Sequence, residues 1–167
     1  MREANVAPAN SRDYTTQDYI KLLAPLYLAE FELALKPYPV ILPVRPFQRW
    51  SAAQTSKSLV WYDGYHLTKH DRQTHFDKAT LKNCIDAVCA NLVLFSVRFS
   101  PYPLYHEGGT VSALFAQLFE ISLRDCSPDS FYLPLLKFPN NFNPNLICFD
   151  CVREKLKQPW SVQRLAV

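Results

Sequence analysis

Three of the four histidines in this chain lie close together, beside two aspartates, in the twelve-residue stretch from His66 through His70, Asp71 and His75 to Asp77. Imidazole can ligate zinc, and it can act as acid or base near neutral pH. If His66 ends a strand and the other two histidines follow in a connection, the three rings converge only where that connection folds back. The stretch therefore predicts either a metal or acid–base site or a solvated polar loop.

A second possible metal site is Cys148-x2-Cys151, which has half of a zinc-ribbon or redox signature. A closed zinc site needs two more ligands, and no second Cys-x2-Cys exists. Cys126 or a histidine would have to complete the site through the fold. On a helix the two sulfurs share one face, which suits plain core packing equally well. We expect no cofactor, with zinc as the alternative.

Several enzyme classes are made improbable by what the chain lacks. It has three glycines, which are too few to write a dinucleotide-binding fingerprint or a phosphate-binding loop. Neither Gly-x-Ser-x-Gly nor His-Glu-x-x-His occurs. We therefore expect a non-catalytic protein, and leave open a small metal-dependent enzyme or a zinc-stabilised domain.

The region 36–82 is basic and aromatic, with eight Lys or Arg residues against three Asp. Interleaved basic and aromatic side chains can neutralise phosphate and stack on bases. The alternative is that the aromatic side chains form core and the charges are spread over a solvated surface. Nucleic acid is a possible partner, and the residues expected to contact it are Arg45, Arg49, Lys57, Lys69 and Arg72.

Residues 37–50 form a proline-rich segment, in which prolines at 37, 39, 43 and 46 enclose the apolar run Val40-Ile41-Leu42. Too many backbone N–H groups are missing for a central strand, so we predict an extended edge or a strap over the surface. Its aromatic residues pack on this chain or contact another protein or a second copy. The expected function is that of an accessory or adaptor subunit, with protein contacts through Tyr38, Phe47 and Trp50.

The elements that must position these residues indicate a small α+β domain over 14–158, between a flexible arm (1–13) and a tail (159–167). Thr15 and Asp18 have the spacing of a capping box, and 26–36 is helix or a strand through Phe31, Leu33 and Leu35. The Asp63-Gly64 pair predicts a β-hairpin over 59–67. We expect this hairpin and a strand at 93–99 to pack against three to four helices, which begin near residues 15, 77, 109 and 144.

The chain gives little indication of export or of membrane insertion. The five cysteines are an odd number, and no stretch combines a basic start, an apolar run and a small-residue cleavage site. The longest apolar stretch, around 92–97, is far shorter than the roughly 20 residues that cross a bilayer. An intracellular protein, cytoplasmic or nuclear, is the expectation.

Overall fold

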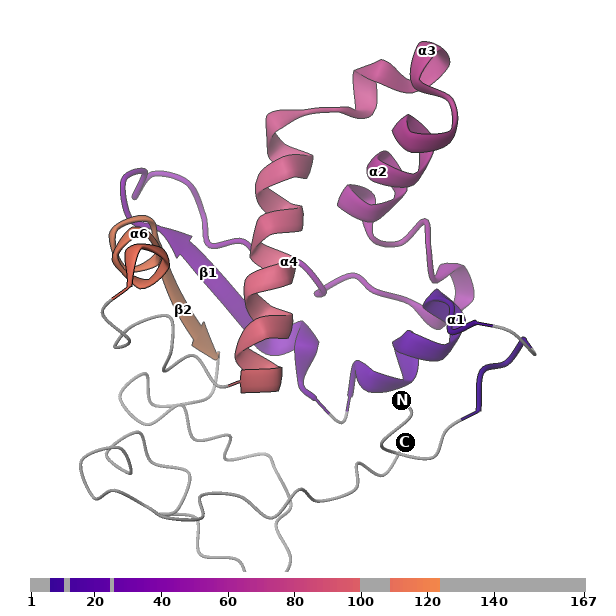
Figure 1. Cartoon of the computed structure of the whole chain (residues 1–167), viewed down its shortest axis with the longest axis horizontal. Coiled ribbons are helices and arrows are strands. Elements are labelled where there is room, and N and C mark those ends of the chain that lie inside the picture. Colours follow the sequence, from indigo (N-terminus) through magenta and orange to yellow (C-terminus); the bar gives the residue numbers. More distant parts are fainter. Residues whose placement is uncertain (1–6, 11–12, 25, 100–108, 124–167) are drawn as a thin grey trace, which may run out of the picture.

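The computed structural model describes residues 7–10, 13–24, 26–99 and 109–123. Within them the chain forms helices and a two-stranded antiparallel sheet, which confirms the predicted α+β class. Helix α4 lies between the sheet on one side and α2 on the other (Figure 1). In chain order the main elements are α1 (Thr16–Tyr19), β1 (Phe31–Leu35), α2 (Val60–His70), α3 (Arg72–His75), α4 (Leu81–Phe99), α6 (Thr110–Leu118) and β2 (Phe119–Leu123).

Helix α1 begins at the predicted capping box. The buried Asp18 carboxylate accepts a hydrogen bond from the Thr15 backbone N–H at 3.0 Å and another from the Thr15 hydroxyl at 3.2 Å. It also accepts from the backbone N–H of Ala9 at 2.8 Å. The carboxylate thus starts the helix and ties the preceding segment to it.

The sheet joins segments that are far apart in sequence. Strand β1 takes the strand alternative predicted for 31–35, and it pairs with β2 from Phe31 opposite Leu123 to Leu35 opposite Phe119. Leu33 and Ile121 face each other at the centre of the sheet and are fully buried. On its other edge β1 forms a single antiparallel bridge to Val44, so the proline-rich segment borders the sheet at this point.

The hairpin predicted over 59–67 is wrong, because these residues lie in and just before helix α2. Gly64 is buried inside this helix, where a Cβ atom would stand 2.7 Å from Asn83 Nδ2 and 3.3 Å from the Lys78 carbonyl oxygen. The glycine therefore permits a close approach to the start of α4 and does not form a turn. The β-prone aromatic residues are helical because tertiary packing overrides a weak local preference.

The strand predicted over 93–99 is also wrong, since α4 continues to Phe99. The buried positions along α4 recur at helical spacing, which the alternation of apolar residues at 93, 95, 97 and 99 concealed. The helix begins at Leu81, where the Thr80 hydroxyl accepts from the Asn83 N–H at 3.1 Å; Asp77, the expected cap, lies in the preceding 3-10 helix η5 (Phe76–Lys78). The buried residues of α4 are Asp86, Cys89, Ala90, Val93 and Ser96.

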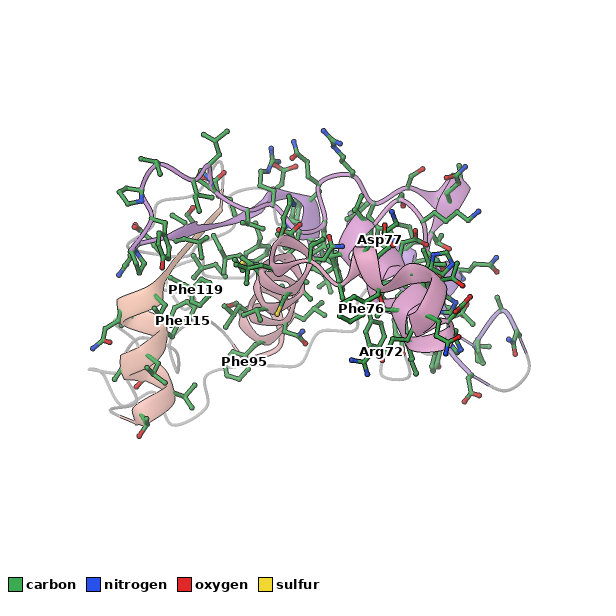
Figure 2. The ribbon with its side chains drawn as sticks, turned by 90° about the horizontal axis from the view of Figure 1, so that it is seen from above. Arg72, Phe76, Asp77, Phe95, Phe115 and Phe119 are labelled. Atoms are coloured by element: carbon green, nitrogen blue, oxygen red, sulfur yellow. The ribbon has the colours of Figure 1, made fainter. Side chains whose placement is uncertain are left out.

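The helix predicted after Gly108-Gly109 is confirmed as α6, with Gly109 at its N-cap, but it ends at Leu118 and β2 follows directly. Phe115 and Phe119 stack at 5.9 Å across this junction and lie between α6 and α4 (Figure 2). The core is built from the 3-10 helix η3 (Leu28–Glu30), β1, the segment before α2, α4, α6 and β2. Its buried residues are Leu28, Phe31, Leu33, Phe47, Leu59, Cys89, Ala90, Val93, Phe115 and Ile121. The predicted helix at 144–158 and the tail lie outside the described residues.

In the described part of the chain, no single helix is long and apolar enough to cross a membrane. One bent pair, Arg72–Lys78 with Leu81–Val97, passes the same test of length and composition, with a bend of 79° between its members.

Candidate functional sites

The most exposed apolar side chains of the proline-rich segment lie between residues 37 and 43, which we call the 37–43 loop. Val40 is 91% exposed and Leu42 is 84% exposed, and Tyr38 and Ile41 beside them are also exposed. Large apolar side chains at such exposure are costly in water when they are grouped, and grouped patches are typical of contact sites. The apolar run was visible in the sequence between its flanking prolines, but the contact role was assigned to the aromatic residues instead.

Backbone hydrogen bonds hold both ends of the 37–43 loop. Leu33 and Val44 exchange two of them, at 2.9 and 2.8 Å, and Lys36 N–H donates to the Leu118 carbonyl at 3.0 Å. Inside the loop, Tyr38 N–H donates to Leu35 and Ile41 N–H donates to Tyr38, both at 2.9 Å. The exposed side chains are therefore carried on a turn with a defined backbone.

The three aromatic residues expected to contact a partner differ in their surroundings. Tyr38 is exposed on the loop. Phe47 is only 3% exposed and packs against Trp50 and Trp61, with ring centroids 5.6 and 6.0 Å away, so its expected contact role is replaced by a role in the core. Trp50 is half-buried and its indole N–H donates to the Thr55 carbonyl at 2.8 Å. Of the three, only Tyr38 has an exposed side chain that a partner could contact without rearrangement.

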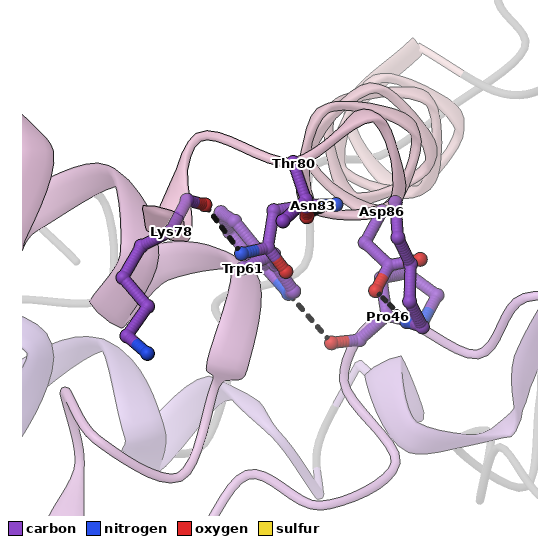
Figure 3. Close-up of polar contacts among 7 residues, drawn as sticks. Pro46, Trp61, Lys78, Thr80, Asn83 and Asp86 are labelled. Carbon is purple, nitrogen blue, oxygen red and sulfur yellow. Dashed lines mark hydrogen bonds and ion pairs between the residues drawn. The ribbon is translucent and has the colours of Figure 1, made fainter. Parts of the chain in front are cut away.

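A hydrogen bond from Trp61 links α2 to the proline-rich segment, because its indole N–H donates to the Pro46 carbonyl at 2.9 Å (Figure 3). Nearby, Asn83 Nδ2 donates to the Lys78 carbonyl at 2.9 Å, and Lys82 forms an ion pair with Asp86. These contacts place α2, the start of α4 and residue 46 in one packed unit.

The basic residues expected to bind nucleic acid do not form one continuous surface of unpaired charge. Arg45 is partly buried, donates to the Ala29 carbonyl at 2.9 Å and forms an ion pair with Glu30 at 3.7 Å. Arg49 and Lys57 are exposed on the segment that leads to α2. Arg45, Lys78 and Lys82 are three of the eight basic residues of region 36–82, and all three are in ion pairs. These pairs lower the positive charge that a phosphate would meet.

The cationic groups of Lys69 and Arg72 lie over the faces of exposed aromatic rings. The Lys69 ammonium lies 5.7 Å from the centre of the Tyr65 ring, and the Arg72 guanidinium lies 5.6 Å from the centre of the Phe76 ring. Arg72 and Phe76 lie on the side of α4 opposite Phe115 and Phe119 (Figure 2). Each pair combines a cation with a π-face, the two features that single-stranded nucleic acid requires.

Two of the three clustered histidines come together on α2. The ring centroids of His66 and His70 are 4.6 Å apart and the rings are tilted by 55°, while Tyr62 stacks on His66 at 6.4 Å and 19°. His75 lies in α3, and among the described residues no group of three His, Cys, Asp or Glu side chains is placed to hold a metal ion. The expected three-histidine cluster is thus reduced to a pair. Cys148 and Cys151 lie outside the described residues.

Two buried groups have shifted pKa values. Hydrogen bonds from the backbone N–H groups of Thr15 and Ala9 hold the pKa of the Asp18 carboxyl below its ordinary value of 3.8. Burial, with a smaller effect from the Asp86 carboxylate, raises the pKa of the Cys89 thiol to about 12. Both shifts fit structural roles, because Asp18 remains ionised and Cys89 remains a neutral, unreactive thiol near pH 7.

No family model, curated protein or solved structure matches this chain.

Proposed function

We propose that this chain is a non-catalytic accessory or adaptor protein that inserts the 37–43 loop into an apolar groove of a protein partner. The observation that carries the proposal is the exposure of Val40 (91%) and Leu42 (84%) on a loop whose two ends are hydrogen-bonded to β1 and α6. A loop without a defined backbone would lose conformational freedom on binding, and this one has already lost much of it on folding.

The energetics favour a few apolar anchors over a broad surface. Full burial of a Val or Leu side chain is worth about 1.5–3 kcal/mol, so the pair would contribute roughly 3–6 kcal/mol to a complex. Residues 37–43 carry no charged side chain, which suits the desolvated centre of an interface. The exposed Lys36 at the start of the loop favours a partner whose groove has an acidic rim.

The test compares the wild type with a doubly substituted loop, Val40→Asp together with Leu42→Asp. The matched control is Val60→Asp, because Val60 is also exposed (63%) and an acidic residue is tolerated in the first turn of α2. All three proteins are used as bait in a cell extract with quantitative mass spectrometry. Proteins that bind the control but not the loop variant are then purified, and their affinities for the wild type and for each variant are measured by titration.

We expect the loop variant to weaken binding of the purified partner at least about a hundredfold, the equivalent of about 3 kcal/mol, while Val60→Asp changes it less than threefold. Light scattering on the purified wild-type chain measures its mass, and so distinguishes self-association of the chain from binding to a different protein. If the loop variant captures the same proteins with the same affinities as the control, the proposal is wrong.

Nucleic acid is a second candidate partner, supported by the cation–ring pairs Lys69 with Tyr65 and Arg72 with Phe76. Binding to random single-stranded RNA and DNA would be measured over a range of salt concentrations. If the pairs contact phosphate and bases, Lys69→Ala with Arg72→Ala reduces the slope of log K against log salt by roughly 1–2. Lys78→Ala, which removes a cation already paired with Asp77, is the control. Equal slopes for both variants would exclude this candidate.

A further inference from the structure

We propose that His66 and His70 form an open binding site for one divalent transition-metal ion, with both imidazoles as ligands and water in the remaining positions. This inference does not depend on the proposed docking function, because α4 separates α2 from the sheet to which the 37–43 loop is attached (Figure 1). It rests on the geometry of the two rings, on their support by α2 and on their exposure.

The spacing and the ring geometry both suit a shared ion. Residues four apart on a helix lie one above the other on the same face, and this spacing is the one used by the two histidines of zinc-binding helices. Because a Zn–N bond is about 2.0–2.1 Å long, two imidazoles on one ion have centroids about 4.5–5.2 Å apart. The observed separation of 4.6 Å lies in this range.

The surrounding residues orient the pair before any ion arrives. Tyr62 stacks on His66 from the preceding turn. Trp61, which is hydrogen-bonded to Pro46, meets the Tyr62 ring edge-on at 5.8 Å. His70 is the last residue of α2, where the carbonyl end of the helix favours a cation. The metal ion would therefore meet a pair of neighbouring rings, one of them stacked on Tyr62, at the favourable end of the helix dipole.

The ligand set indicates which ions bind and how tightly. Imidazole suits Cu²⁺, Ni²⁺ and Zn²⁺, and their affinity for a nitrogen site decreases from Cu²⁺ to the other two. With two protein ligands the affinity is lower than at a closed four-ligand zinc site, and at least two positions stay open to water or to a donor from another molecule. The region around the pair also carries Lys69, whose ammonium lies over the Tyr65 ring.

The experiment titrates Zn²⁺ into the full chain, stripped of metal with a chelator, and follows the imidazole nitrogens by NMR. This readout is specific to the histidines and so separates their site from zinc bound by cysteine thiolates elsewhere in the chain, and free zinc is set with a competing chelator so that such binding does not change the affinity that is measured. His66→Ala and His70→Ala assign the signals and remove one ligand each. His75→Ala is the matched control from the neighbouring helix, and circular dichroism verifies that each variant is folded.

We expect the His66 and His70 signals to shift together as free zinc rises, with a single affinity for both, and each of the two single substitutions to weaken that affinity at least tenfold. His75→Ala should leave it within twofold. Zinc should also raise the Tm of the wild type and of His75→Ala, and not that of folded His66→Ala, since an ion bound by both histidines stabilises α2. Wild-type signals that do not move with zinc, or a loss of affinity as large in His75→Ala as in His66→Ala, would overturn the proposal.

Discussion

The backbones of Leu33 and Val44 exchange two hydrogen bonds, of 2.9 and 2.8 Å, and so close residues 34–43 into a ring attached to the sheet. Leu33 is fully buried, whereas the ring between the two residues carries the most exposed apolar side chains of the proline-rich segment. The same pair thus joins the core of the protein to its candidate docking surface.

Replacing Val44 with proline tests that connection, because proline has no N–H to donate to the buried Leu33 carbonyl. Leaving such an acceptor unpaired costs about 1–3 kcal/mol, and we expect a loss of stability of this size in chemical denaturation. Val44→Thr keeps the N–H and the branched shape, so it is the control. Equal stability of the two variants would mean that the bridge contributes little.

Asp18→Asn should make stability less sensitive to acid. Backbone N–H donors of Thr15 and Ala9 depress the folded-state pKa of Asp18 below 3.8, so its stabilising effect is complete above that pH and is lost as the pH falls through the lower, folded-state pKa. We expect Asp18→Asn to lower the Tm at pH 7 and the difference from wild type to shrink towards pH 2. The exposed Asp13→Asn is the control, and thermal unfolding at several pH values is the measurement. A difference that is constant with pH would contradict the assignment.

Gly64 and Asn83 should be energetically coupled. A helix is more stable with alanine than with glycine at an interior position, by up to about 1 kcal/mol. At position 64, however, the alanine Cβ would stand 2.7 Å from Asn83 Nδ2 and would displace that amide from the Lys78 carbonyl. We expect Gly64→Ala to be more favourable by about 1 kcal/mol in an Asn83→Ala background than in the wild type. A double-mutant cycle by chemical denaturation measures this, and additive effects would show that the close contact is easily relieved.

Ser96 and Leu94 distinguish the observed helix from the strand that the sequence favoured. In a strand both would face outward, whereas in α4 Ser96 is 5% exposed and donates to the Leu92 carbonyl, and Leu94 is 45% exposed. We expect Ser96→Lys to destabilise by about 3 kcal/mol or more, since it buries a charge, and Leu94→Lys to change stability by less than about 1 kcal/mol. Similar small effects from both would favour the strand.

Cys84 and Cys89 should differ strongly in reactivity. The thiol of Cys89 is fully buried and its pKa is raised from 9.0 to about 12, which lowers its thiolate fraction near pH 8 about a thousandfold. Cys84 is exposed on the same helix. Iodoacetamide labelling followed by peptide mass spectrometry should modify Cys84 in the native protein and Cys89 only after unfolding. Equal labelling in the native state would show that α4 opens readily.

Sequence reasoning succeeded where the determining interactions are local. The α1 capping box needs only residues 15–18, and the start of α6 follows from Gly109 and the apolar periodicity after it. The strand alternative at 31–35 follows from large apolar residues at every second position, Phe31, Leu33 and Leu35. In these cases neighbouring residues contain the information that decides the structure.

The sequence did not predict the structure where a segment fits both the helical period of 3.6 residues and the strand period of 2, because distant contacts then decide between helix and strand. Asp63-Gly64 fits a hairpin turn, and what makes the segment helical is packing against residues 78 and 83, which no local pattern reveals. Val93 and Val97 fit either a strand or a helix, and the burial of Ser96 between them is decided by the packing of α4. The cluster of His66, His70 and His75 was identified from the sequence, but its close pair was not, because the four-residue spacing of His66 and His70 brings the rings together only on a helix.

The pairing of β1 with β2 also has a consequence for biosynthesis. Phe31 pairs with Leu123, 92 positions further along the chain, and at about 5–20 residues per second the ribosome needs roughly 5–18 s to make the intervening stretch. Until then β1 has no partner strand, and the side chains of Phe31 and Leu33, which are buried in the folded protein, are exposed to water and to other nascent chains. Strands paired over such a distance form late, so we expect the newly made N-terminal part to expose apolar surface until residues 119–123 have been made.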